Sequence, residues 1–190
     1  MITENAIAAI GWLFEKSARE NLSSLSQHDC KVIPLLDTPK QRVDEKHSLV
    51  ALNIASYSFR IVVLLDYYPT AAALGYLADV LRIADKTLAG QALFDAQGEF
   101  INMLCGVVNR RLSTEFRHVG MSTPFFLNSA CGSYVAVLKP THAQSFEVSI
   151  DNTPLFKLTL CTCVASGTTL DFHVARTEQE EVSTGELEFF

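Results

Sequence analysis

Hydrophobic positions in the first part of the chain predict one helix followed by three strands. Ile7, Ile10 and Leu13 recur at helical spacing within residues 3–25, and Thr3 is a suitable cap for the first turn. Apolar and β-branched runs then predict strands over residues 32–36, 49–55 and 58–66, and the polar stretch 38–46 predicts a loop. Because only two residues separate the last two runs, we expect these strands to form a hairpin.

Two further helices are predicted in the middle of the chain. The second helix begins at Pro69 and Thr70. Its buried stripe is expected at Leu74, Leu77, Leu81 and Ala84. After a short break at Gly90, apolar residues at helical spacing predict a third and longer helix over about residues 93–116.

After the third helix the pattern changes from helical spacing to strands. Phe146, Val148 and Ile150 alternate with polar residues, which is typical of a strand with one buried face. Runs of this kind predict strands over residues 125–127, 133–139, 145–150, 155–164 and 169–175, with a turn at 151–154. Since the strands come in adjacent runs, the predicted fold class is α+β, a largely antiparallel sheet with helices packed on one face.

Composition indicates one domain with an acidic tail. The 190 residues carry a net charge of −6, and residues 177–190 hold five glutamates and no basic residue. We expect a single domain over residues 1–176 and a disordered tail over 177–190. Without the tail the chain is nearly neutral, so it offers no basic stripe for a phosphate backbone and nucleic-acid binding is not expected.

Membrane segments, disulfides and metal sites are not predicted. The chain does not start with a basic segment followed by an apolar stretch. Its longest aliphatic run, residues 61–65, is far shorter than the roughly 18 residues that span a bilayer, so we expect a cytoplasmic protein with no membrane contact. Five irregularly spaced cysteines and five dispersed histidines predict reduced thiols and no metal site.

One face of the third helix carries an unusual group of residues. Asp95, Glu99, Asn102, Gly106 and Asn109 are spaced 4, 3, 4 and 3 apart, which places them in a stripe about 80° wide. Glycine inside a helix costs about 1 kcal/mol relative to alanine, which suggests that another molecule approaches the backbone there. A solvated polar face is the alternative explanation, although the stripe contains no lysine or arginine.

Residues 95–102, DAQGEFIN, fit the signature D/S-x3-E-x2-N and resemble the CheC/CheX/FliY family of chemotaxis phosphatases. The family helix has a glycine four residues after the asparagine, and Gly106 matches it. The signature ends with a proline about two dozen residues on; Pro124 follows Asn102 after 21 residues, one fewer than the family spacing. Because the first helix has no second E-x2-N, the chain looks like single-site CheX rather than CheC.

This resemblance implies a phosphatase that hydrolyses the aspartyl phosphate of a CheY-like receiver domain in a response regulator. Asn102 would orient the attacking water, and Glu99 would pair with the receiver's lysine. The implied partner contacts are Asp95, Gly106 and Asn109. Pro124 would shape the strand beside the helix. The chain itself would bind no cofactor, since Mg²⁺ is expected in the receiver, and CheX-type proteins are similar to one another in forming homodimers.

A non-catalytic binding module of the same fold is the second hypothesis. Such a module would dock on a receiver domain or a motor-switch component, and Glu99 and Asn102 would only recognise the partner. The sequence contains no glycine-rich phosphate loop and no local nucleophile motif that would favour another class of enzyme. Loss of the phosphoryl group from a receiver, followed with and without the protein, distinguishes the two hypotheses.

Overall fold

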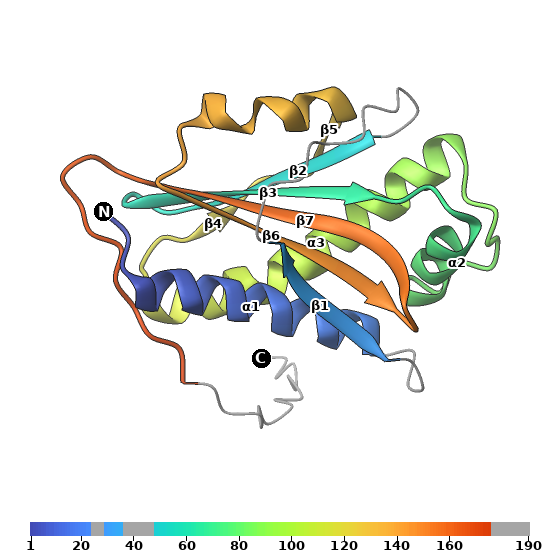
Figure 1. Ribbon diagram of the computed structural model, residues 1–190, viewed down its shortest axis with the longest axis horizontal. Helices are drawn as coiled ribbons and strands as arrows, with labels where there is room; N and C mark the ends of the chain where they lie inside the picture. The colour runs from blue at the N-terminus through green and yellow to red at the C-terminus, as the bar shows by residue number, and fades with distance from the viewer. Residues whose placement is uncertain (24–28, 36–47, 176–190) are drawn as a thin grey trace, which may run out of the picture.

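The computed structural model describes residues 1–23, 29–35 and 48–175 (Figure 1). The helices are α1 (Glu4–Ser23), α2 (Ala71–Val80), α3 (Gly90–Glu115) and the 3₁₀ helix η1 (Ser129–Leu138). The strands are β1 (Cys30–Leu35), β2 (Ser48–Ala55), β3 (Phe59–Tyr67), β4 (Gly120–Met121), β5 (Phe125–Asn128), β6 (His142–Ile150) and β7 (Thr153–Val164). The expected loop at 38–46 and the acidic tail at 177–190 fall outside the described residues.

Within the described residues, the strands form one seven-stranded sheet with antiparallel neighbours throughout. The order is β1-β6-β7-β3-β2-β4, and β5 also pairs with β2. The strands β4 and β5 therefore follow each other along the outer edge beside β2, and β1 forms the opposite edge. The α+β prediction and the β2–β3 hairpin are confirmed.

The predicted turn between β6 and β7 is also confirmed. Ile150 pairs with Thr153, so only Asp151 and Asn152 form the loop. Their φ angles are 48° and 63°, which lie in the left-handed region. A two-residue hairpin loop of type I′ needs positive φ at both positions, and aspartate and asparagine tolerate that conformation better than most residues.

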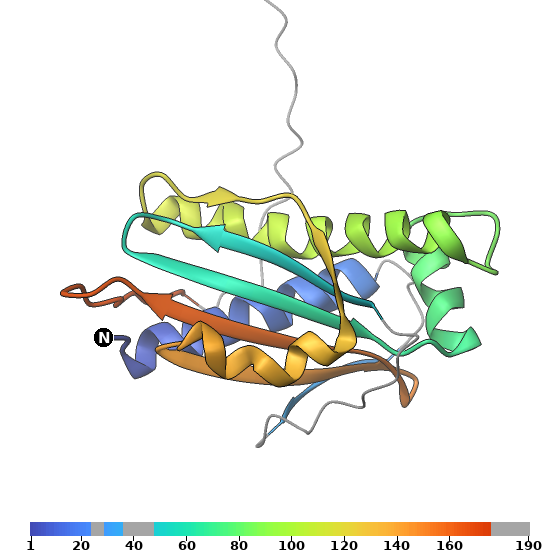
Figure 2. The ribbon, with the colours of Figure 1, turned by 90° about the horizontal axis from the view of Figure 1, so that it is seen from above.

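The helices α1 and α3 cover one face of the sheet, and α2 packs at its end (Figures 1 and 2). A continuous apolar core fills the space between them. The ring of Phe100, on α3, lies 5.8 Å from the ring of Tyr67 and 5.4 Å from that of Phe156, measured between centroids. No helix within the described residues combines the length and apolarity needed to cross a membrane.

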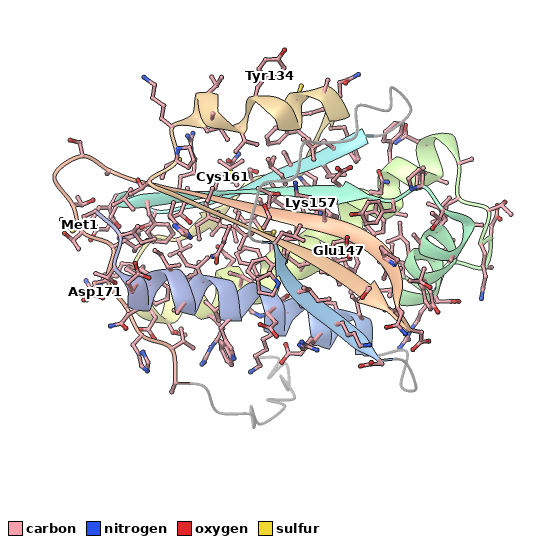
Figure 3. The ribbon with its side chains drawn as sticks, in the orientation of Figure 1. Met1, Tyr134, Glu147, Lys157, Cys161 and Asp171 are labelled. Atoms are coloured by element: carbon pink, nitrogen blue, oxygen red, sulfur yellow. The ribbon has the colours of Figure 1, made fainter. Side chains whose placement is uncertain are left out.

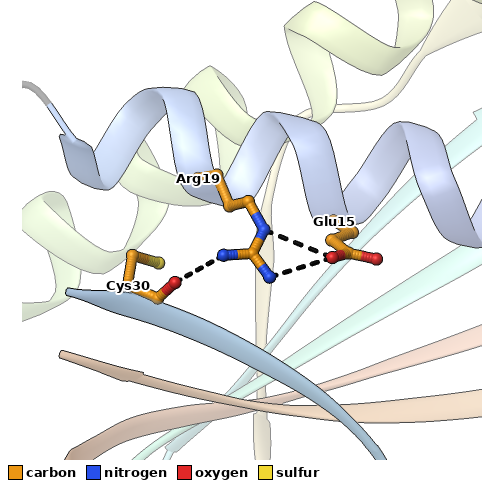
Figure 4. A network of polar contacts seen from close by, with 3 residues as sticks. All are labelled: Glu15, Arg19 and Cys30. Carbon is orange, nitrogen blue, oxygen red and sulfur yellow. Dashed lines mark hydrogen bonds and ion pairs between the residues drawn. The ribbon is translucent and has the colours of Figure 1, made fainter. Parts of the chain in front are cut away.

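Polar contacts fix α1 at its start and near its end. The hydroxyl oxygen of Thr3 accepts a hydrogen bond of 3.2 Å from the backbone N–H of Ala6, which confirms the predicted cap. Further along, Arg19 pairs with Glu15 at 2.9 Å and donates a hydrogen bond to the carbonyl oxygen of Cys30 (Figure 4). This last contact ties the edge strand β1 to the helix.

The predicted strand over residues 133–139 was wrong, because this segment belongs to the 3₁₀ helix η1. The side-chain oxygen of Asn128 caps the start of η1, and Lys139, with φ of 46°, ends it. The helix η1 lies across the sheet from α1 and α3 (Figure 1). Val135 and Leu138 pack there on a small apolar cluster of the sheet. Their spacing of three residues is helical, whereas the β-branched composition had suggested a strand.

The strand predicted over residues 169–175 was also wrong. One isolated bridge joins Leu170 to Ile2, and no ladder follows it among the described residues. Leu170, Phe172 and Val174 are nevertheless buried, while the residues between them are exposed. The alternation marks an extended chain with one buried face, and strand pairing requires a neighbour that this segment does not have.

Three smaller differences concern element boundaries. The helix α2 ends at Val80, so Leu81 and Ala84 lie beyond it. Of the expected buried stripe, Leu77 is buried, Leu74 and Leu81 are partly buried, and Ala84 is exposed. Gly90 begins α3 instead of preceding it, with φ of 55°. The two-residue strand β4 was not predicted, since Gly120 and Met121 show no alternating pattern.

Candidate functional site

The stripe predicted from the sequence lies on the outer side of α3, which is unbroken from Gly90 to Glu115. Asp95 and Glu99 are exposed, and Asn102, Gly106 and Asn109 are partly exposed. On the opposite side of the helix, Phe100, Leu104 and Val108 are completely buried in the core. This division of α3 into a buried and an open side leaves the polar stripe free to contact another molecule.

Glu99 and Asn102 are brought together as the spacing predicted. Residues three apart on a helix are surface neighbours, about one turn from each other. Among the described residues, neither side chain is engaged in a hydrogen bond or an ion pair. The carboxylate and the amide are therefore both available to groups of a partner.

Pro124 lies against α3 one residue from Glu99. A side chain at Gly98 would place its Cβ 3.9 Å from the Cβ of Pro124 and 3.7 Å from the Cζ of Phe126, which is ordinary van der Waals contact. The link between β4 and β5 thus packs directly on the helix beside the candidate site. Pro124 immediately precedes β5, a position from which it can shape that strand, and its role stays a prediction.

Gly106 leaves an open space on the stripe. Apart from its own helix, a Cβ at this position would meet no atom within 4 Å. Packing inside the molecule therefore does not require a glycine there. Gly75 in α2 is equally open, so the open space at Gly106 permits the close approach of a partner, and its contact role stays a prediction.

The polar groups at the two ends of the stripe differ in whether they have a hydrogen-bond partner within the described residues. The Nε2 of Gln91 donates a hydrogen bond of 2.7 Å to Oδ1 of Asp95. The Oδ1 of Asn109 is buried and has no hydrogen-bond partner among the described residues. Gln91 was not among the sequence candidates, although its position four residues before Asp95 is a spacing at which helix side chains meet.

Two aromatic residues beside the stripe were also missed. The rings of Phe94 and Phe126 lie 5.0 Å apart at an interplanar angle of 79°, an edge-to-face contact. Phe94 is 38% exposed and Phe126 is 39% exposed. Phe94 comes from α3 and Phe126 from β5, so only the fold brings the two rings together.

Cys105 lies beneath the stripe, next to Gly106 in the sequence. It is fully buried, and this burial raises the pKa of its thiol. A neutral thiol enclosed in apolar surroundings is a poor nucleophile. We therefore assign Cys105 to the core and not to the chemistry of the site.

Several solved structures share this arrangement of sheet and helices. CheX from Vibrio vulnificus matches with a TM-score of 0.56 at 14% identity, over 79% of this chain and 96% of that chain. CheX from Borrelia burgdorferi, in a complex with CheY, BeF3 and Mg²⁺, matches with a TM-score of 0.58 at 12% identity, over 80% and 96%. FliM from Helicobacter pylori, in a complex with SpeE, matches with a TM-score of 0.51 at 11% identity, over 85% and 89%.

These likenesses define the class of fold. The chain is an α+β domain with one antiparallel sheet, and its longest described helix carries the exposed Glu99 beside the partly exposed Asn102. Its fold is that of the CheX and CheC-like chemotaxis proteins, as the signature in α3 predicted. No family model matches the sequence, and a comparison with curated proteins gives no match.

Proposed function

We propose that this chain is a phosphatase that hydrolyses the aspartyl phosphate of a CheY-like receiver domain. In this proposal Asn102 orients the attacking water and Glu99 pairs with a lysine of the receiver. The observation that carries it is the accessibility of both side chains, one turn apart on an unbroken helix. Asp95, Gly106 and Asn109 then form the surrounding contact surface.

The amide of Asn102 suits the reaction for an electrostatic reason. Phosphoryl transfer passes through a loose transition state, so the position of the water and the placement of charge dominate catalysis. A carboxylate base close to the phosphoryl oxygens would be repelled by their negative charge, and a neutral amide is not. The carbonyl oxygen of the amide accepts a hydrogen bond from water while its NH₂ group donates, so it can hold a water in line with the P–O bond.

The carboxylate of Glu99 supplies orientation rather than chemistry. Its attraction to a lysine strengthens when docking excludes water from the interface. Since α3 is a continuous helix, fixing Glu99 also fixes Asn102 relative to the phosphoryl group. Orientation of this kind lowers reaction barriers by several kcal/mol.

The receiver completes the catalytic centre in this proposal. It contributes the aspartyl phosphate, the lysine and a bound Mg²⁺, and this chain contributes no cofactor. The structural likeness to a CheX that forms a complex with CheY supports a receiver as the partner. We also propose a cytoplasmic location and a homodimer, and light scattering on the full chain tests the subunit number.

A binding module without catalysis is the second candidate function. The same fold occurs in FliM, whose solved structure is a complex with SpeE. Since one fold can carry different functions, the fold does not distinguish a phosphatase from a docking module. Only the rate at which the receiver loses its phosphoryl group distinguishes the two functions.

The test uses a CheY-type receiver phosphorylated with acetyl phosphate and freed of excess donor. The full chain is added, and the remaining phosphoryl groups are measured over time. We expect faster loss with the wild-type chain and no acceleration with Asn102→Ala. Asn5→Ala, on the exposed part of α1, is the matched control and should behave like wild type. Binding of the receiver without acceleration by the wild-type chain would favour the binding module.

A further inference from the structure

The Phe94–Phe126 pair is an apolar surface that the fold leaves partly uncovered. The two rings contact each other edge to face, yet each keeps more than a third of its surface exposed. Phe126 pairs with the buried Val50 in register, so it stands on the helix-bearing side of the sheet. The pair is thus an outward extension of the core at the junction of α3 and β5.

This aromatic pair adjoins the acid–amide pair on the same helix. Phe126 contacts the position of Gly98, which directly precedes Glu99. Phe94 lies four residues before Gly98, and Asp95 lies four residues before Glu99. An aromatic row and an acidic row therefore run side by side along α3. The aromatic pair therefore borders the surface around Glu99 and Asn102.

The charges of this surface define the chemistry of its partner. Between Gly90 and Val108 the chain carries Asp95 and Glu99 and no basic residue. The adjoining residues 120–128 carry no charged side chain. The complementary surface on a partner is therefore an apolar patch next to a cationic group.

We infer that the Phe94–Phe126 pair is the hydrophobic half of the docking surface for the receiver, and that it binds an apolar patch beside the receiver's lysine. The inference rests on the proposed function and adds that affinity and chemistry come from different residues of the surface. The aromatic pair supplies affinity, because aromatic anchors in a desolvated centre dominate interface energies. Glu99 and Asn102 supply register and chemistry.

The test separates affinity from turnover. Phe94→Gln should raise the KM for the phosphorylated receiver and the Kd for a beryllofluoride-activated receiver by about tenfold, with kcat unchanged. Asn102→Ala should show the reverse, a lost kcat with little change in Kd. Tyr134→Ala is the matched control, since Tyr134 is 67% exposed and projects from η1 on the other side of the sheet (Figure 3). It should match wild type in both quantities.

A second measurement avoids substitutions altogether. Hydrogen exchange of the wild-type chain should show protection at residues 94–99 and 125–127 when the activated receiver is added, with no change at residues 129–138. Protection at Glu99 and Asn102 that does not extend to the aromatic pair would overturn the inference.

The possible failures are distinguishable. A wild-type chain that neither binds the receiver nor accelerates its dephosphorylation overturns the proposed function itself. A wild-type chain that does both, together with a Phe94→Gln variant of unchanged Kd and KM, overturns only the role of the aromatic pair. A Phe94→Gln variant that changes the subunit number in light scattering and leaves the receiver affinity unchanged assigns the pair to a contact between copies, which also overturns the inference.

Discussion

The hydroxyl group of Ser17 on α1 donates a hydrogen bond of 2.8 Å to the carbonyl oxygen of Leu104 in the middle of α3. Both residues are fully buried. Leu104 follows Asn102 by two positions, so this contact joins the two long helices directly behind the candidate site. The bond is a structural support for the site rather than a part of its chemistry.

Replacing Ser17 with alanine is therefore expected to weaken the fold and spare the reaction. The hydroxyl oxygen of Ser17 also accepts a hydrogen bond of 3.3 Å from Nδ2 of Asn21. The free energy of unfolding should fall by at least about 0.5–1.5 kcal/mol, the usual net value of one intramolecular hydrogen bond. Urea titration followed by circular dichroism measures this loss. The receiver affinity of the folded protein should stay unchanged, and a large loss of affinity would show that the contact positions α3 for docking.

Substitutions at Gly106 should distinguish an effect on the stability of the fold from an effect on binding of the receiver. Because its Cβ would meet no neighbour outside the helix, Gly106→Ala should raise the free energy of unfolding by up to about 1 kcal/mol. Gly106→Leu should also fold but should block the receiver by occupying the open space. Thermal melting measures the first effect, and receiver binding the second.

Gly75 in α2 provides the control for Gly106. It is also helical, and a Cβ there would meet nothing within 4 Å. Gly75→Leu should be as well tolerated by the fold as Gly106→Leu, without any loss of receiver binding. Equal effects of the two leucine variants on binding would contradict a specific role for Gly106.

Phe100 is expected to contribute much more to stability than Phe94, the partly exposed aromatic residue of the same helix. Its ring is fully buried between Tyr67 and Phe156. Phe100→Ala should lower the free energy of unfolding by about 3–5 kcal/mol, since it removes a large apolar side chain and leaves a cavity. Phe94→Ala, on the partly exposed side, should cost clearly less in the same urea titration. Similar costs for the two variants would be inconsistent with the described packing.

Because of the buried thiol of Cys161, the stability of the folded protein is expected to fall at alkaline pH. Burial raises the pKa of its thiol from 9.0 to about 11 in the folded protein. The folded state thus favours the protonated thiol, and the resulting stabilisation is complete below pH 9 and is lost as the pH rises to 11. Wild-type stability should fall more steeply across this window than that of Cys161→Ala. The exposed Cys131 serves as the control, and Cys131→Ala should follow the wild-type curve.

Much of the fold was predictable because local patterns and tertiary packing agree. The alternation at Phe146, Val148 and Ile150 gave the strand β6, and the turn at Asp151 and Asn152 gave the hairpin. The expectation of a single buried face was wrong for β6, because Ser145 and Ser149 are buried as well. The 3₁₀ helix η1 was not predictable from composition, because its valines and tyrosine also suit a strand. The capping oxygen of Asn128 was the available signal for a helix start.

The candidate site was predictable only as far as it lies on one helix. Glu99 and Asn102 share α3, so their common face follows from helical geometry alone. Phe94 and Phe126 are 32 residues apart in sequence and lie on different elements, and their contact depends on β5 pairing with β2. The spacing of apolar residues within either segment does not predict a contact between the two segments.

Both outer edges of the sheet contain a proline. Pro34 lies within β1, and Pro124 lies between β4 and β5. Proline has no backbone N–H to offer, so a foreign strand that aligns with either edge finds its ladder interrupted. The two prolines therefore work against the pairing of a second molecule's strand with β1 or with the β4–β5 edge.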